Sequence, residues 1–247
     1  MLVDIEDLKR TYVMGDTEVH ALRGVTFDIE RGDYVSIIGP SGSGKSTLMH
    51  LLGCLDKPTS GSYRLDGTPI QELDDVELSR LRNQKVGFVF QSFNLIHQHT
   101  VMENVEVPLI YGGVERNERR ERAMEMLEAV GLGHRFDHRP NELSGGENQR
   151  VAVARALVTQ PDIILADEPT GNLDTKTGAE IMQLLQELND SGKTIIMVTH
   201  DLEKAAWTKR LIQMKDGKIV RIITGDDRKR LIELFHETPA LAESTQM

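Results

Sequence analysis

The chain has 247 residues, enough to bury the core of one large domain or of a domain with an inserted lobe. Its formal net charge of −10 argues against nucleic acid as a partner, because a nucleic-acid binder needs a basic face to neutralise phosphates. The single cysteine, Cys54, excludes an internal disulfide and favours a reducing, cytoplasmic setting. No signal-peptide core and no apolar run of the ~18 residues that a membrane span needs is present, so we expect any membrane role to come through a partner.

Strands and helices alternate along much of the chain, which predicts an α/β fold with a mostly parallel sheet. Residues 3–29 are typical of short strands in an N-terminal antiparallel β subdomain, with turns at Gly15-Asp16 and Arg23-Gly24. Four apolar runs predict buried strands, and four segments rich in helix-forming residues predict helices. The predicted strands are 34–39, 86–90, 163–167 and 194–199, and the predicted helices are 45–52, 115–130, 145–159 and 177–188.

A helix-rich block at about residues 93–159 interrupts this alternation. We therefore expect a main domain of residues 1–224 into which a helical lobe is inserted. Residues 225–247 are predicted to form a tail, with a short amphipathic helix and then a frayed end, and we assign it no function.

A glycine-rich segment lies between the predicted strand 34–39 and the predicted helix 45–52. It fits the pattern G-x-x-x-x-G-K-[ST] of a phosphate-binding loop, which predicts a P-loop NTPase core. We expect Lys45 to reach the β and γ phosphates and the Ser46 hydroxyl to bind Mg²⁺. A plain glycine-rich turn would not account for the lysine and the hydroxyl. The loop consists of Gly39, Pro40, Ser41, Gly42, Ser43, Gly44, Lys45, Ser46 and Thr47.

Two acidic residues, Asp167 and Glu168, follow the apolar run at 163–167. Asp167 suits binding of Mg²⁺ through its coordination shell, and Glu168 is then available to orient or deprotonate an attacking water. Such a base contributes ~10²–10⁴-fold in rate. The alternative is an acidic turn that ends the strand at Pro169. Together with the phosphate loop, the pair predicts hydrolysis of a nucleoside triphosphate.

A second candidate cradle lies at the start of the helix 145–159, in Ser144, Gly145, Gly146 and Glu147. Ser144 and Glu147 also fit a capping box, which needs no ligand. A capping box does not explain two adjacent glycines, each of which costs about 1 kcal/mol relative to alanine inside a helix. Close approach of a γ-phosphate to the backbone does explain them. Because one triphosphate needs one such cradle from a subunit, two in a chain suggest that ATP is held between two copies.

The order of these motifs resembles that of the nucleotide-binding subunit of an ATP-binding-cassette (ABC) system, from Val3 to about Ile222. The resemblance implies that ATP and Mg²⁺ are the ligands. It also implies that two copies pack head to tail, with each ATP between one phosphate loop and the signature of the partner. The motifs that carry it are Gly39–Thr47 (Walker A), Gln91 (Q-loop), Leu143–Glu147 (signature), Ile163–Glu168 (Walker B), Asn172–Asp174 (D-loop) and His200 (switch histidine).

The resemblance also implies roles for four single residues. Gln91 would contact Mg²⁺ or the lytic water, and His200 would contact the γ-phosphate rather than act as an ordinary surface or core histidine. Asp174 would reach across the dimer, although it also suits the N-cap of the helix 177–188. Tyr12 would stack on adenine, which adds ~0.5–1.5 kcal/mol beyond burial, although it also suits an ordinary strand.

Segments 53–61, 88–95, 103–109 and 166–174 are similar to macrolide-exporter and lipoprotein-releasing ATPases, a group that includes the cell-division ATPase. This similarity implies an ATPase on the cytoplasmic face of the membrane that drives a permease, with the permease contact at about residues 91–111. A cargo-free signalling ATPase of the cell-division type and a soluble ABC ATPase are the alternatives.

Five apolar residues within the expected permease contact either line a groove for the permease or pack the core of the helical lobe. His97 and His99 have no metal-ligand partners at a suitable spacing, so we expect them at the surface. The five apolar residues are Phe93, Leu95, Ile96, Val101 and Val105.

Overall fold

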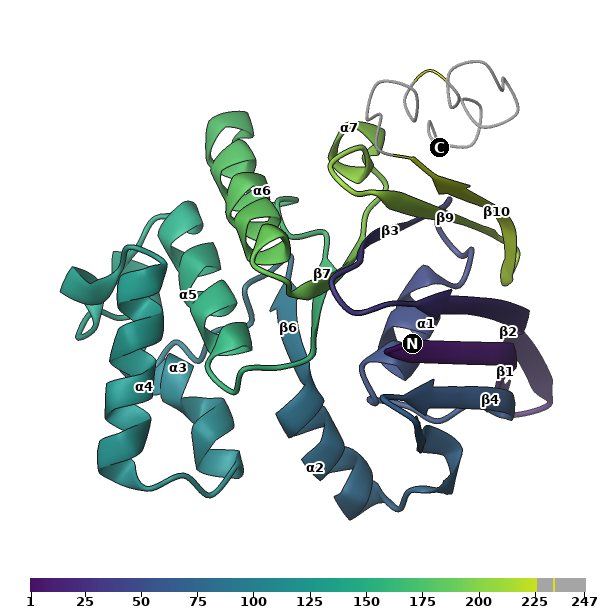
Figure 1. Cartoon of the computed structure of the whole chain (residues 1–247), viewed down its shortest axis with the longest axis horizontal. Helices are drawn as coiled ribbons and strands as arrows, with labels where there is room; N and C mark the ends of the chain where they lie inside the picture. Colours follow the sequence, from purple (N-terminus) through teal and green to yellow (C-terminus); the bar gives the residue numbers. More distant parts are fainter. Residues whose placement is uncertain (226–232, 234–247) are drawn as a thin grey trace. The chain divides into compact units, whose positions relative to one another are not determined.

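The computed structural model describes residues 1–225 and Glu233, which fall into two compact units (Figure 1). The first unit contains residues 1–78 and the described residues from 192 onward, and the second contains residues 79–191. The helix and frayed end predicted for the tail fall outside the described residues, and the lobe boundaries at about 93–159 stay a prediction. In the described part of the chain, no helix combines the length and the apolar character that a membrane span requires.

The first unit begins with an antiparallel sheet of strand order β2-β1-β4-β5. β1 (Val3–Met14) and β2 (Thr17–Ile29) form a hairpin, and the predicted turn at Gly15-Asp16 is confirmed because Met14 pairs with Thr17. β4 (Ser60–Leu65) pairs with the other edge of β1, and β5 (Thr68–Pro69) pairs with β4. The 3-10 turn η1 (Ile70–Glu72) follows.

The prediction of a turn at Arg23-Gly24 is wrong, because both residues lie inside β2. Lys9 pairs with Arg23 and the preceding Leu8 pairs with Val25, so Gly24 is an extra residue in the ladder. Its φ of 90° is a conformation that favours glycine, and the local structure is a β-bulge. Gly24 does mark an irregular point of the backbone, as the sequence suggested, but that point is a bulge within one strand and not a turn between two.

The first unit also holds strands in the order β10-β9-β3-β8. The central strand β3 is parallel to both β8 and β9, and every residue of β3 and β8 is buried. Because parallel strands end at the same edge, the segments that follow β3 and β8 meet there. The strands are β3 (Tyr34–Ile38), β8 (Thr194–Val198), β9 (Arg210–Lys215) and β10 (Lys218–Thr224).

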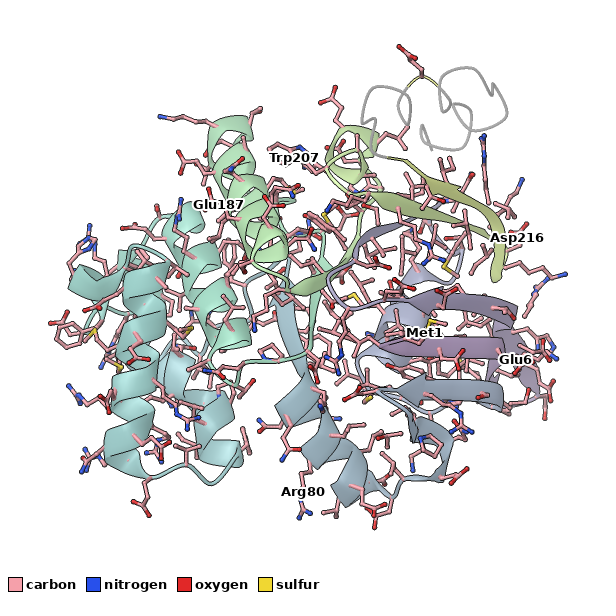
Figure 2. The ribbon with its side chains drawn as sticks, in the orientation of Figure 1. Met1, Glu6, Arg80, Glu187, Trp207 and Asp216 are labelled. Carbon is pink, nitrogen blue, oxygen red and sulfur yellow. The ribbon has the colours of Figure 1, made fainter. Side chains whose placement is uncertain are left out.

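Helix α1 (Lys45–Leu52) follows β3 at its predicted bounds and buries Leu48, Met49, Leu51 and Leu52. The short helix α7 (Leu202–Ala205) follows β8 and precedes the half-buried Trp207, which Figure 2 labels. Both helices thus start from the edge at which β3 and β8 end.

In the second unit, β6 (Val86–Phe90) pairs in parallel with β7 (Ile163–Asp167), and both strands have their predicted bounds. Helix α2 (Asp75–Lys85), which the sequence did not predict, leads directly into β6. Helices α3, α4 and α5 lie side by side (Figure 1). The remaining elements are α3 (Val101–Tyr111), α4 (Arg116–Ala129), η2 (Gly133–Arg135), η3 (Pro140–Glu142), α5 (Gly145–Leu157) and α6 (Thr175–Asp190).

Local capping sets where these helices begin. The unpredicted α3 begins after Thr100, whose side chain forms a capping box with Glu103. α6 begins two residues earlier than predicted, because Asp174 accepts hydrogen bonds from the first-turn N–H groups. The helix buries Ile181, Met182 and Leu185, whereas Glu187 extends away from it (Figure 2).

The contact between β6 and α5 requires a glycine at position 87, because a Cβ atom there would lie 2.3 Å from the carbonyl oxygen of Ala156. We expect Gly87→Ala to lower the free energy of unfolding by about 1–3 kcal/mol through overpacking. Urea denaturation followed by circular dichroism measures the change. The control is Gly225→Ala, since a Cβ atom there meets nothing within 4 Å. Equal stability of the two variants would contradict the packing explanation.

Candidate active site

The phosphate loop leaves β3 and wraps around the Lys45 side chain. The Lys45 ammonium donates to the carbonyl oxygens of Gly39 at 2.7 Å and of Pro40 at 2.9 Å. The Ser46 side chain belongs to an exposed residue in the first turn of α1. The predicted lysine and hydroxyl are therefore both at a helix N-terminus, where backbone N–H groups and the helix dipole favour an anion.

Two glycines set the path of this loop. A Cβ atom at Gly39 would lie 2.2 Å from the carbonyl oxygen of Met214, and one at Gly44 would lie 2.6 Å from that of Ala21. Gly44 is the N-cap of α1 and has a φ of 99°, in the left-handed region. A larger residue at either position would displace the loop backbone.

His200 lies at the same edge of the first unit as the phosphate loop. Thr199, between β8 and His200, donates its N–H to the carbonyl oxygen of Ile37 in β3 at 3.2 Å. Asp201 caps α7 by accepting from the N–H groups of Glu203 and Lys204. The exposed residue His200 thus follows a strand that pairs with β3, at the edge where the phosphate loop begins.

In the second unit, the two strands that carry acidic and amide residues also end at one edge. Phe90 of β6 pairs with Asp167 of β7, so Gln91 and Glu168 follow neighbouring parallel strands. Glu168 has a φ of 46°, a left-handed conformation that a non-glycine residue adopts at a cost of about 1–3 kcal/mol. Strain at this residue, which the sequence did not predict, is typical of functional positions.

The Gln91 side chain lies against the segment that follows β7. Its Nε2 donates to Asn172 Oδ1 at 3.3 Å, and Asn172 Nδ2 donates to the Gln91 carbonyl oxygen at 3.1 Å. A Cβ atom at Gly171 would lie 2.5 Å from Gln91 Nε2, so only glycine leaves room for this arrangement. Gln91 and the predicted D-loop are thereby joined within one unit.

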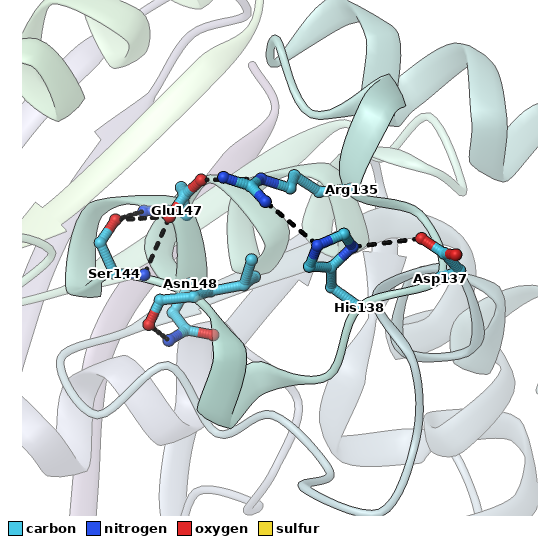
Figure 3. A network of polar contacts seen from close by, with 7 residues as sticks. Arg135, Asp137, His138, Ser144, Glu147 and Asn148 are labelled. Carbon is cyan, nitrogen blue, oxygen red and sulfur yellow. Dashed lines mark hydrogen bonds and ion pairs between the residues drawn. The ribbon is translucent and has the colours of Figure 1, made fainter.

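The predicted capping box at the start of α5 is confirmed (Figure 3). Glu147 Oε2 accepts from the Ser144 N–H at 2.9 Å and from its hydroxyl at 2.8 Å. These bonds, the backbone one first, lower the pKa of the Glu147 carboxyl. The Arg135 Nε forms an ion pair with Glu147 Oε1 at 3.3 Å, and this charge lowers the same pKa further.

Arg135 is in turn held by a neighbouring imidazole (Figure 3). Its Nη1 lies 3.0 Å from His138 Nε2, and His138 Nδ1 lies 3.1 Å from Asp137 Oδ1. A neutral His138 that donates from Nδ1 accepts from Arg135 at Nε2. The sequence did not predict this chain of side chains behind the capping box.

The two glycines of the signature have an internal cause that the sequence interpretation missed. A Cβ atom at Gly146 would lie 2.3 Å from Thr177 Cγ2 in α6, and one at Gly145 would lie 3.2 Å from Leu173 Cδ2. Close packing of α5 on the start of α6 therefore requires glycine at 146 without any ligand. Gly146 by itself therefore does not indicate a phosphate, whereas the contact at Gly145 is tight without requiring glycine.

Asp174 binds Thr177, the residue against which Gly146 packs. Its Oδ1 accepts from the N–H groups of Lys176 and Thr177, both at 3.1 Å, and its Oδ2 accepts from the Thr177 hydroxyl at 2.6 Å. These bonds, that of the Thr177 hydroxyl first, lower the pKa of the Asp174 carboxyl. The N-cap interpretation of Asp174 is confirmed, and any role across a dimer would come in addition.

Arg155 of helix α5 binds the segment that follows Gln91. The Arg155 guanidinium donates to the carbonyl oxygens of Phe93 at 2.8 Å and Asn94 at 2.5 Å. Burial lowers the pKa of this guanidinium. Phe93 and Asn94 both have positive φ, at 60° and 50°. The buried Gln149 of α5 donates to the carbonyl oxygens of Phe90 and Pro169. Neither side chain was identified from the sequence.

Of the apolar residues expected at a permease groove, some pack into a core and others are exposed. Leu95, Val101 and Val105 are buried within the second unit, whereas Ile96 is 38% exposed and Phe93 is half-buried. His97 is exposed as predicted, and His99 is half-buried. Across the described residues, no group of three or more His, Cys, Asp and Glu side chains is arranged to hold a metal ion.

A buried strand, a glycine-rich loop and a helix that begins with Lys45 together define a P-loop nucleotide-binding protein. Residues 22–171 match the sequence model of the ABC transporter family. An uncharacterised ABC transporter ATP-binding protein from Thermotoga maritima is 54% identical over 88% of this chain and 93% of its own length. The chain belongs to the ABC transporter family and is one of its ATP-binding subunits, an ABC ATPase.

Solved structures and longer relatives agree with this family. The chain superposes on the dimeric ATP-binding cassette MJ0796 of Methanocaldococcus jannaschii with a TM-score of 0.82, at 50% identity, over 90% of this chain and 98% of that one. It is 52% identical to the macrolide export ATP-binding/permease protein MacB of Hyphomonas neptunium, over 89% of this chain but 34% of that protein. The ABC ATPase cassette fold predicted from the motifs is confirmed.

Because its folded-state pKa lies below the ordinary value of 4.5, the Glu147 carboxylate stabilises the fold at neutral pH. This contribution is present above the unfolded-state pKa and is lost as the pH falls through the folded-state pKa. Glu147→Gln keeps a capping side chain, so we expect its unfolding midpoint to fall less than that of the wild type between about pH 6 and about pH 3.5. Thermal unfolding across this range measures the effect. Glu121→Gln, at an exposed position of α4, is the control, and an acid response of Glu147→Gln equal to that of the wild type would contradict the assignment.

The contact between Gly146 and Thr177 predicts a rescue by a second substitution. Gly146→Ala should lower the free energy of unfolding by about 1–3 kcal/mol. Thr177→Ser removes the methyl group and keeps the hydroxyl that Asp174 binds, so the double variant should regain most of that loss. A double-mutant cycle of urea unfolding measures the coupling. Additive losses would show that Thr177 does not cause the need for glycine.

Proposed function

We propose that this ABC ATPase hydrolyses ATP in a head-to-tail homodimer and thereby drives a conformational change in a membrane permease. The observation that carries the proposal is the match of residues 22–171 to the ABC transporter family, which covers both the phosphate loop before α1 and the start of α5 at Ser144. MJ0796, 50% identical to this chain, has been solved as a dimer in a post-hydrolysis state with ADP and Pi, which supports the same assembly here.

The first unit would supply most of the nucleotide contacts. Backbone N–H groups of Gly39–Thr47 would bind the phosphates, and Lys45 would move from the loop carbonyls to the β and γ phosphates, where its charge gains more. His200, at the same edge, would donate to the γ-phosphate as negative charge develops there. Tyr12 would stack on the adenine base.

The second unit would supply the chemistry of hydrolysis. Glu168 would orient the attacking water and accept its proton, and its left-handed backbone is of the strained kind that clusters at active sites. Asp167 and Gln91 offer a carboxylate and an amide oxygen, and Ser46 of the first unit offers a hydroxyl; each of these is a donor type that suits Mg²⁺. When bound, Mg²⁺ would neutralise charge on the β and γ phosphates.

The residues that would act in trans are Ser144, Gly145, Gly146, Glu147 and Asp174. Ser144 would donate to the γ-phosphate bound by the partner subunit, in place of its present bond to Glu147. The backbone N–H groups of Gly145 and Gly146 lie in the first turn of α5, where an anion is favoured. Asp174 would reach the partner from its N-cap position.

The permease would bind at about residues 91–111, where Ile96, Ile110 and Tyr111 are exposed by 38%, 50% and 82%. The same contact would hold the subunit on the cytoplasmic face of the membrane. Purification of the tagged chain from its native membranes should yield an integral membrane protein. Ribosomes or DNA in its place would favour a soluble ABC ATPase.

Glu168→Gln removes the proposed base and keeps the size of the side chain. We expect ATP turnover to fall by about 10²–10⁴-fold while ATP binding persists, because the phosphate loop is intact. With MgATP the variant should elute from gel filtration as a dimer. The control Glu121→Gln should keep wild-type turnover and should form no trapped dimer. Full turnover by Glu168→Gln would overturn the proposed mechanism.

Ser144→Arg places a long cation at the start of α5. If Ser144 acts on the partner's nucleotide, the monomer should bind ATP with unchanged affinity while MgATP-dependent dimer formation and hydrolysis are lost. Titration calorimetry and gel filtration measure the two properties separately. Lost binding of ATP to the monomer would mean that Ser144 acts within its own subunit.

A further inference from the structure

Tyr12 is held by two other side chains of the first unit. Its hydroxyl donates to Asp56 Oδ2 at 2.9 Å, and the Cζ of Arg10 lies 4.6 Å from the centre of its ring. Arg10 Nη2 in turn forms an ion pair with Asp56 Oδ1 at 2.8 Å. One carboxylate therefore uses its two oxygens to hold both the tip of the tyrosine and the cation on its face.

The backbone places each member of the triad formed by Arg10, Tyr12 and Asp56. Arg10 and Tyr12 are alternate residues of β1, so their side chains share one face of the strand. Asp56 lies in the turn after α1, and its Oδ1 also accepts from the Lys57 N–H at 2.8 Å. That turn is tied to the end of α1, because Leu55 donates its N–H to the carbonyl oxygen of His50. The triad thus connects β1 to the helix that begins at the phosphate loop.

The triad also limits how a base can bind. One face of the Tyr12 ring carries the guanidinium, so a purine can stack only on the opposite face. Arg10 and Asp56 each have side chains that are 23% exposed, which makes their ion pair less screened than the more exposed Lys9–Asp7 pair of this unit. A tyrosine fixed before binding loses less conformational freedom when a base stacks on it.

We propose that Asp56 and Arg10 are positioning residues that hold Tyr12 ready for the base of a nucleotide. They act on recognition of the purine and not on the phosphates. This inference rests on the proposed stacking of Tyr12 on adenine and adds the residues that determine its strength.

Two ligands separate base recognition from phosphate binding: MgADP, which carries the base, and inorganic pyrophosphate, which does not. Titration calorimetry on the full chain would measure both dissociation constants for the wild type, Tyr12→Ala, Tyr12→Phe and Asp56→Ala. We expect Asp56→Ala and Tyr12→Phe to weaken MgADP about 5-fold and to change pyrophosphate less than about 2-fold. Lys9→Ala, which removes the exposed Lys9–Asp7 ion pair of the same strand, is the control and should change neither.

A double variant distinguishes positioning from a general structural role. Tyr12→Phe and Asp56→Ala remove the same hydrogen bond, so together they should weaken MgADP no more than Asp56→Ala alone. Additive losses, or equal weakening of MgADP and pyrophosphate, would overturn the inference. Unchanged MgADP affinity in Tyr12→Ala would overturn the proposed stacking itself. Weakened binding by Tyr12→Ala with unchanged binding by Asp56→Ala would overturn the positioning role alone.

Discussion

At Gly39, a Cβ atom would lie 2.2 Å from the carbonyl oxygen of Met214, so the chain can pass from β3 into the phosphate loop only as glycine. This approach presses the loop against β9, the neighbour of β3. β8 pairs with the other edge of β3 and brings His200 to the same end. The phosphate loop and His200 are therefore placed by one set of strand pairings, and the backbone N–H groups of the loop need little reorganisation to bind an anion.

In the second unit, helix α5 is the element that holds the candidate site residues in position. Its first turn carries the capping box of Ser144 and Glu147. Further along, Gln149 binds the carbonyl oxygens of Phe90 and Pro169, and Arg155 in the last turn binds those of Phe93 and Asn94. The segment after Gln91 and the start of α5 are therefore connected by contacts that lie on one helix.

Much of the fold was predictable because its signals are local. The strands 86–90 and 163–167 are continuous apolar runs, and the start of α5 has its own capping box. Helix α3 was missed because it is largely apolar and contains Pro108, so it lacks a helical pattern. The hairpin of β9 and β10 was missed although Asp216-Gly217, both with positive φ, is a turn signal between strands. The site motifs were predicted by their spacing. Arg155, Arg135 and Asp56 were not, because each acts on residues brought near only by folding; Arg155 and Phe93 are 62 positions apart.

The segment between β8 and β9 has one further property. It begins with His200, continues through α7 and contains Trp207, the single tryptophan of the chain. Trp207 is half-buried, and its backbone N–H donates to the carbonyl oxygen of Lys204 in α7. Indole emission responds to the polarity around the ring. The wild-type protein therefore carries an intrinsic fluorophore seven positions from His200, and no dye is needed to follow this segment in real time.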